Sequence, residues 1–478
     1  MTVRNKKFLE ITSLILLFIL GLIFRLKGIS TNHSFWSDEA FVSSISKSIV
    51  LGKTGLIEGI NTIVYSRLQI LTTVISFRLF GISEWSSRLP SVIWGSIGII
   101  FCYLLAKKHS NKYGGYLAAI IYSILQLNLS QSTQSKPYAA IETLLLINIY
   151  FIDTNPLICI LSSFSATLYN NIGIILFIPI IIFYINKFSI SIKKPIIVLV
   201  SISTILLLFF LKIPYMIIGI ISPQYNWLTY FRELFWRQYA FITLPGLLGI
   251  FTIKNKKVVY GILVSLIVLI YSWCFVSYSH NIRYVVPIFG VLITFFGVFW
   301  ANVGEIIFKK PALICLSVAI LVYAGGYKIV RKPAAYYTPN ADFTSDIQNA
   351  DFKTFFQKSY QLFPDFDNLP VFVGPFDTLK WYTDKNPTAL FSINTPKSVY
   401  VAIDDSWQYG SLVDFIAQQA RYPKGLVVIN DWQSFMPDDI KDYVKKNMRL
   451  ELRVESMAVS PDEKWPLELY SWGFDNKK

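Results

Sequence analysis

Long apolar runs that contain almost no charge dominate the first two thirds of this 478-residue sequence. Residues 89–106 and 285–302 contain no Asp, Glu, Lys or Arg, and residues 8–24 contain only Glu10. A helix needs roughly 20 apolar residues to cross a bilayer, and fewer in a closely packed bundle. With 54% hydrophobic residues, 16% aromatic residues and a mean hydropathy of +0.48, most of the chain is expected to be surrounded by lipid.

The hydropathy pattern predicts about eleven membrane-spanning helices, so the expected fold class is mainly α and polytopic. The first span is followed by Arg25 and Lys27 and not by a small-residue cleavage site, which predicts that it stays uncleaved. The predicted spans are 8–24, 89–106, 114–129, 138–152, 156–168, 172–185, 195–211, 239–251, 258–279, 285–302 and 311–327.

One further apolar run, residues 63–80, contains Arg67 and Arg78. If this run does not cross, every lysine-rich connection shares one side of the membrane with the basic N-terminus, as the positive-inside rule requires. If the run does cross, the lysine-rich connection 107–112 falls on the outer side and the distribution contradicts the positive-inside rule. We therefore predict an interfacial or re-entrant helix at the outer surface and a cytoplasmic N-terminus. The connections in question are 107–112, 186–194, 254–257 and 309–310.

Charge is unevenly divided along the chain. Residues 1–330 contain 27 Lys or Arg and 9 Asp or Glu, whereas residues 331–478 contain 17 and 20. The formal net charge of +15 therefore belongs to the membrane part, where loop lysines explain it better than nucleic-acid binding does. The four cysteines lie within apolar runs and have no CxxC spacing, so neither a disulfide framework nor a thiolate zinc site is predicted.

The sequence pattern changes after about residue 331, where long apolar runs give way to shorter ones. Short strand-like runs at 371–373, 399–403 and 426–429 alternate with polar turns and with a helical stretch at 412–420. We therefore predict two domains, a membrane domain of residues 1–330 and a soluble α/β domain of residues 331–478 on the extracytoplasmic side.

An acidic pair, Asp38-Glu39, lies about a dozen residues after the first predicted span. Only nine carboxylates occur in residues 1–330, and charge near lipid is kept mainly where it pairs or functions. The pair could simply cap a helix that begins at Ala40, because Asp is a favoured capping residue and helix N-termini favour negative charge. Composition alone gives the two interpretations about equal weight.

The segments around the pair decide between these interpretations. Residues 35–40 read Phe-Trp-Ser-Asp-Glu-Ala and residues 134–139 read Gln-Ser-Lys-Pro-Tyr-Ala. Residues 78–91 contain Gly-Ile-Ser-Glu-Trp-Ser-Ser-Arg-Leu-Pro, and residues 283–287 read Arg-Tyr-Val-Val-Pro. Taken in their order along the chain, these four segments resemble motifs of the GT-C superfamily of polyprenyl-phosphate-sugar-dependent glycosyltransferases. That superfamily includes the protein O-mannosyltransferase-like enzymes of glycosyltransferase family 39 and the aminoarabinose-transferase-like enzymes.

The resemblance implies roles for matching residues. It places Asp38 as the general base of an inverting sugar transfer from a polyprenyl-phosphate donor to a lipid, glycan or protein acceptor. Glu39 would orient Asp38, help to hold a metal or only solvate the loop. Lys136 and Arg283 would stabilise the leaving phosphate, although Arg commonly stands in place of Lys136. The substrate-binding candidates are Lys136, Tyr138, Glu142, Arg283, Tyr284 and Arg67.

The sequence also departs from this superfamily. Related enzymes often begin the interfacial helix with a His-Pro or acidic-Pro element, and here residues 65–67 read Tyr-Ser-Arg. We therefore expect no required cofactor, with a divalent metal as an option. The expected partners are the lipid donor, an acceptor and membrane lipids, but no nucleic acid, and the expected location is a bacterial plasma membrane.

Two other classes of protein fit part of the pattern. A transporter or lipid flippase would explain many spans and membrane arginines, but not why the signature residues fall on one predicted face. The chain could also be a membrane-anchored binding protein whose outer domain carries the function. The motifs of the membrane part would then be coincidental.

Overall fold

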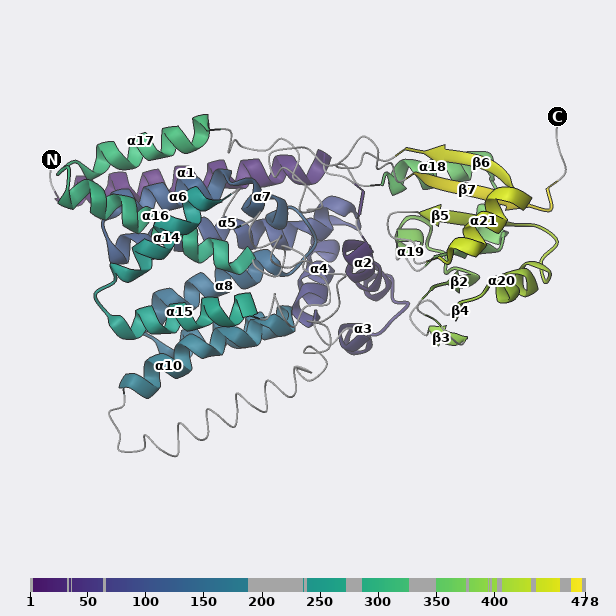
Figure 1. The fold of residues 1–478 in the computed structure, drawn as a ribbon, viewed down its shortest axis with the longest axis horizontal. Helices are drawn as coiled ribbons and strands as arrows, with labels where there is room; N and C mark the ends of the chain where they lie inside the picture. The colour runs from purple at the N-terminus through teal and green to yellow at the C-terminus, as the bar shows by residue number, and fades with distance from the viewer. Residues whose placement is uncertain are drawn as a thin grey trace. The chain divides into compact units, whose positions relative to one another are not determined.

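The computed structural model divides the chain into two compact units, of residues 1–31 with 56–346 and of residues 32–55 with 347–478 (Figure 1). We call the first the helical unit and the second the α/β unit, and each is described by itself. The described residues are 3–31, 34–35, 37–62, 66–187, 235, 239–271, 286–325, 350–374, 378–393, 395, 398–401, 406–430, 436–455 and 466–474.

The helical unit consists of helices packed side by side (Figure 1). Three of its described helices, which cover Phe8–Lys27, Glu84–His109 and Val286–Ile306, are long and apolar enough to cross a membrane, and five apolar helices are shorter. The elements are α1 (Val3–Thr31), α3 (Leu56–Thr62), α4 (Arg67–Phe80), α5 (Glu84–His109), α6 (Lys112–Ile124), α7 (Gln126–Ser132), α8 (Tyr138–Phe151), α9 (Pro156–Tyr169), η1 (Asn171–Leu176), α10 (Phe177–Lys187), α14 (Ala240–Phe251), α15 (Lys256–Tyr271), α16 (Val286–Ile306) and α17 (Pro311–Ala324).

Helix α16 forms the centre of this unit. It packs against α5, α6, α8, α14 and α17. In its most apolar stretch of 18 residues, 78% is buried, compared with 11% in the corresponding stretch of α1. Close approach to α6 depends on glycine, because a Cβ added at Gly297 would lie 2.4 Å from the backbone oxygen of Gly114. Small residues at such crossings let helices in lipid pack backbone to backbone.

Local signals in the sequence set several helix starts. Ser83 and Ser86 form a capping box that begins α5, and Asn111 accepts two backbone N–H groups at the start of α6. Asn155 caps α9, with Pro156 in its first turn. These signals match the helix starts expected from hydropathy to within a few residues.

Two predicted spans are interrupted. The expected span 114–129 ends as α6 at Ile124, Leu125 has extended backbone angles, and α7 continues to Ser132. The expected span 172–185 begins as the 3-10 helix η1 before α10. Of the remaining expected spans, residues 195–211 and the end of 258–279 lie outside the described residues.

The run with two arginines, predicted as an interfacial helix, forms α4 over Arg67–Phe80. Its polar residues Gln69, Thr73 and Ser76 lie on the buried side, and the helix packs against α5 and α9. Its exposed residues include Arg78 and Phe80. This division into a buried and an exposed side agrees with a helix that lies against the bundle, while its depth in the membrane stays a prediction.

The α/β unit is built on a seven-stranded sheet with the order β3-β4-β2-β1-β5-β7-β6. The central pairs β1–β2, β1–β5 and β2–β4 are parallel, and the outer pairs are antiparallel. The elements are α2 (Ser37–Val50), α18 (Phe352–Leu362), η5 (Phe366–Asn368), β1 (Val371–Val373), α19 (Thr378–Thr383), β2 (Ala389–Phe391), β3 (Val399–Val401), β4 (Ser406–Tyr409), α20 (Leu412–Gln419), β5 (Gly425–Asn430), α21 (Asp438–Asn447), β6 (Arg449–Val454) and β7 (Leu467–Trp472).

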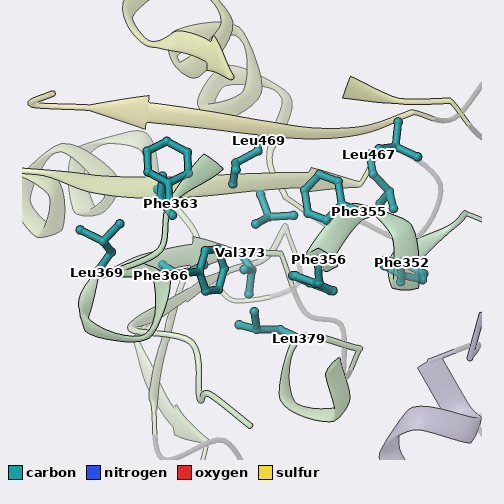
Figure 2. Packing of buried hydrophobic residues seen from close by; sticks show 14 of the residues in the cluster. Phe352, Phe355, Phe356, Phe363, Phe366, Leu369, Val373, Leu379, Leu467 and Leu469 are labelled. Atoms are coloured by element: carbon teal, nitrogen blue, oxygen red, sulfur yellow. The ribbon is translucent and has the colours of Figure 1, made fainter. Parts of the chain in front are cut away.

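Two hydrophobic clusters cover the two faces of the sheet. On one face, Phe355 and Phe356 of α18 gather with Phe366, Val373 and Leu469 (Figure 2). On the other, Phe372 and Phe415 pack with residues of α21. Strands buried on both faces read as continuous apolar runs, which is why 371–373 and 426–429 were recognisable in the sequence.

The predicted fold class, a mainly α polytopic membrane protein with a C-terminal α/β domain, is confirmed. The domain boundary proposed at residue 330 falls outside the described residues. Residues 32–55, which the sequence assigned to the membrane domain, group with the C-terminal residues because α2 packs on α19.

Candidate functional site

The acidic pair lies in the first turn of α2. Asp38 is half-buried, whereas Glu39 is fully buried. The N-terminal end of a helix carries partial positive charge, which favours carboxylates at this position. A buried carboxylate is costly unless other groups compensate its charge. Asp38 remains the more accessible of the two.

A polar layer crosses the helical unit at α7 and the turn that follows it. Residues 121–146 are all buried, including segment 126–136, which is rich in Gln and Ser and ends in Lys136. Polar groups at membrane depth are expensive and usually serve function or specific helix packing. In this chain the layer contains Lys136 and Tyr138, two of the residues singled out by motif resemblance.

One face of α5 holds the turn that carries Lys136. The Ser87 hydroxyl donates to Ser135 Oγ at 2.8 Å, and the Ser91 hydroxyl donates to the Lys136 carbonyl at 2.9 Å. Gly95 continues this face, since a Cβ there would lie 2.2 Å from Ser132 Oγ. Residues spaced by four lie on one side of a helix, so this Ser-Ser-Gly pattern fixes the backbone at Lys136.

Glu142 of α8 is the acceptor of a buried hydrogen-bond network. Its carboxylate accepts from the Tyr122 hydroxyl at 2.7 Å and from Asn128 Nδ2 at 2.7 Å. It also packs against α16, because a Cβ added at Gly290 would lie 2.8 Å from Glu142 Oε1. Glu142 therefore connects α6, α7, α8 and α16.

Arg25 joins the same network and was not singled out as a site residue from the sequence. It is fully buried in α1, donates to the Gly21 carbonyl at 3.0 Å and to the Tyr122 carbonyl at 3.4 Å, and lies 5.6 Å from the centroid of the Tyr122 ring. Arg88 of α5 is also fully buried. The sequence does contain a signal that could have identified these two residues. An arginine within or beside an apolar membrane helix is rare and usually has a partner or a function.

The remaining candidates are placed as follows. Arg67 begins α4 and is half-buried, and its Nε has no hydrogen-bond partner among the described residues. Arg283 and Tyr284 lie outside the described residues.

Metal binding was left optional by the sequence. In the described ranges of the chain, no three His, Cys, Asp or Glu side chains gather closely enough to hold a metal ion.

Known proteins share this arrangement of helices. Residues 70–215 match the family model of dolichyl-phosphate-mannose-protein mannosyltransferase. ArnT from Cupriavidus metallidurans in the apo state is similar over 96% of this chain and 98% of that chain, with a TM-score of 0.62 and 11% identity. The chain has the GT-C fold. The GT-C resemblance predicted from the four motifs is thereby confirmed.

Two further solved structures resemble this GT-C chain. ArnT from the same organism bound to undecaprenyl phosphate matches 98% of both chains with a TM-score of 0.50 and 12% identity. The Archaeoglobus fulgidus oligosaccharyltransferase in complex with Zn and sulfate matches 87% of this chain and 67% of that chain, with a TM-score of 0.55 and 10% identity. No curated protein sequence matches the chain significantly.

The matched family model describes a mannosyltransferase, and the similar solved structures are ArnT and an oligosaccharyltransferase. The apolar helices support an integral membrane protein. At identities of 10–12%, the similarity to the solved structures concerns the fold.

Proposed function

We propose that this GT-C chain transfers a sugar from a polyprenyl-phosphate donor to a hydroxyl group of a lipid, glycan or protein acceptor. The observation that carries the proposal is an acidic pair in the first turn of α2, with Glu39 fully buried and Asp38 more accessible, in a chain of GT-C fold. A carboxylate that is ionised at neutral pH and accessible to an acceptor suits the task of a general base.

The proposed reaction is a single displacement. The acceptor oxygen attacks the anomeric carbon of the donor sugar while Asp38 takes the hydroxyl proton. A new carbon–oxygen bond forms as the bond to the phosphate oxygen breaks, and the phosphate leaves with the electron pair. Attack opposite the leaving group inverts the anomeric centre. Glu39, which is buried beside Asp38 in the same helical turn, serves to orient it.

The leaving polyprenyl phosphate gains negative charge in this step, and positive groups stabilise it. Lys136 and Arg283 are the proposed phosphate-binding residues, with Tyr138, Tyr284 and Arg67 contributing to substrate binding. The burial of Lys136 supports this role, because a buried ammonium interacts more strongly with a phosphate than an exposed one does. Glu142 would support the site through Tyr122 and Asn128.

Orientation in the membrane is part of the proposal. The lysine-rich connections and the basic N-terminus would lie in the cytoplasm of a bacterial cell, according to the positive-inside rule. The acidic pair and the α/β unit would then lie on the extracytoplasmic side of the plasma membrane. Protease access to tags at the N-terminus and after residue 478, in intact and permeabilised cells, tests this arrangement.

A transfer assay separates the proposed enzyme from a lipid flippase. The protein would be reconstituted in vesicles with labelled undecaprenyl-phosphate sugars and a lipid extract of its host cells. We expect label to move from the donor lipid to a new product. Movement of the intact donor across the bilayer without any new product would support a flippase instead. Comparing glycans and lipids of cells with and without the gene then identifies the acceptor.

Replacing Lys136 with methionine is expected to lower the transfer rate by about 10- to 100-fold, since the departing phosphate loses one preorganised positive group. Lys136→Arg should retain most activity, because a guanidinium keeps the charge and suits phosphate. The matched control is Lys112→Met at the exposed start of α6. Rates measured from labelled donor at saturating acceptor decide the outcome, and equal rates for Lys136→Met and Lys112→Met would contradict the phosphate role.

A further inference from the structure

The helix that carries the acidic pair is anchored to the C-terminal part of the chain. Residues 32–55 and 347–478 form one compact unit, and α2 packs on α19 within it. Helix α2 has 14 residues, and isolated helices of this length are marginal in water. Its stability and direction therefore depend on contacts with residues more than 300 positions later in the sequence.

The residues that lead into α2 are fixed at several points. The Ser34 hydroxyl donates to Asp351 Oδ1 at 3.1 Å and accepts from the backbone N–H of Lys353 at 3.1 Å. The backbone N–H of Phe35 donates to the Tyr382 hydroxyl at 2.8 Å. The Phe35 ring is fully buried, with its centroid 4.8 Å from that of Trp381. The chain is thus held three residues before Asp38.

The other end of α2 is held by Lys47. Its Nζ lies 2.7 Å from Asp384 Oδ1, donates to the Trp381 carbonyl at 3.3 Å and lies 5.2 Å from the centroid of the Trp381 ring. The Lys47 side chain is 17% exposed and that of Asp384 is 53% exposed. The ion pair alone is thus partly screened by solvent, and the ring and carbonyl contacts add to it. Trp381 connects both anchors, because it also contacts Phe35.

We infer that Lys47, Trp381 and Asp384 are positioning residues for the transfer reaction, an inference that rests on the proposed role of Asp38. They hold α2 at both ends, so that Asp38 and Glu39 have a fixed position and direction. A misplacement of about 1 Å in a reacting group costs up to about 100-fold in rate. The α/β unit therefore acts as part of the catalytic apparatus, because it supports the helix that bears the base.

The test compares two ion pairs of the same unit. Lys47→Met keeps the aliphatic stem but removes all three Nζ contacts, whereas Asp384→Asn removes only the charge of its partner. Asparagine is tolerated at residue 384, where φ is 56°. The controls are Lys441→Met and Asp438→Asn, which break a 3.0 Å pair on α21, and the Lys441 side chain is 16% exposed, closely matching Lys47.

Transfer kinetics and hydrogen exchange of the full chain in nanodiscs give independent readouts. For Lys47→Met we expect kcat to fall by about 10- to 100-fold with the KM for donor lipid unchanged, and Asp384→Asn to give a smaller fall. Amide exchange in peptides from residues 37–50 should become faster, while peptides from β5 and β7 stay protected. Lys47→Arg, which retains the charge, should recover most of the kcat. The control variants should match the unsubstituted protein.

Three outcomes would overturn the inference. One is faster exchange in α2 with kcat unchanged, which would show that the anchor does not position the base. A second is an equal loss of kcat in Lys441→Met, which would show general destabilisation. A third is unchanged exchange in α2 of Lys47→Met. Absence of transfer by the unsubstituted protein would instead overturn the proposed function, and the exchange data would still report on the anchor.

Discussion

Replacing Asp38 with asparagine is expected to reduce sugar transfer by about 100- to 10,000-fold, the contribution typical of general base catalysis. Asparagine has nearly the same shape but cannot accept the proton of the acceptor hydroxyl. The fold should be preserved, since losing one negative charge in the first turn of a helix typically costs only about 0.3–1 kcal/mol. The measurement is the single-turnover rate of transfer from a labelled undecaprenyl-phosphate sugar, with donor binding measured separately.

The matched control is Asp438→Asn, which makes the same chemical change in the first turn of another helix of the α/β unit. Its rate should equal that of the unsubstituted chain. Undiminished transfer by Asp38→Asn would remove Asp38 as the base. The acceptor type provides a second criterion, because a phosphate acceptor is already ionised and needs no base. A large loss with a hydroxyl acceptor thus supports proton transfer specifically.

The variant Glu39→Gln tests whether Glu39 orients Asp38. If Glu39 orients Asp38, its replacement should lower kcat less than Asp38→Asn does. The double variant should then be little slower than Asp38→Asn alone, because residues that act as a unit are not additive.

Replacing Glu142 with leucine is expected to destabilise the helical unit by about 2–4 kcal/mol. The Tyr122 hydroxyl and the Asn128 amide would lose their buried acceptor. In membrane proteins an interhelical hydrogen bond contributes about 0.6 kcal/mol on average, but donors left buried without a partner add a further penalty of about 1–3 kcal/mol. The measurement is the unfolding midpoint in detergent, followed by fluorescence at one heating rate.

Glu142→Gln should lower the stability of the helical unit much less than Glu142→Leu does. One acceptor oxygen remains in glutamine, and the Tyr122 hydroxyl is able to reorient. The control is Glu305→Leu, because Glu305 on α16 is exposed and accepts a single 2.8 Å hydrogen bond from Asn111. Exposed positions usually change stability by less than about 0.5 kcal/mol. A Glu142→Leu protein as stable as Glu305→Leu would show that the network does not hold the helices together.

Several elements could be predicted from local patterns alone. Span 89–106 was visible because no charge interrupts it, and it forms the core of α5. Strands β1 and β5 were recognisable because strands buried on both faces are continuously apolar. The acidic pair was conspicuous because carboxylates are rare in the membrane part. In each case the signal lies within a short stretch of chain.

Other elements depended on contacts that no short stretch contains. The break at Leu125 separates α6 from α7 within one apolar run, and the polar segment after it is buried between helices. Arg25 of α1 and Glu142 of α8 belong to one network because both contact Tyr122 of α6. Hydropathy records how apolar a helix is, but not which partner each face meets.

Hydrophobic periodicity and motif spacing are local properties, so the sequence was enough to predict the membrane spans, the C-terminal α/β domain and the resemblance to GT-C motifs. The grouping of α2, with Asp38 and Glu39, and the C-terminal residues in one compact unit became visible only in the folded chain. The contact between Lys47 and Trp381 joins residues separated by 334 positions. Such pairing depends on the whole chain being folded, since each partner by itself looks like an ordinary surface lysine or an ordinary core tryptophan.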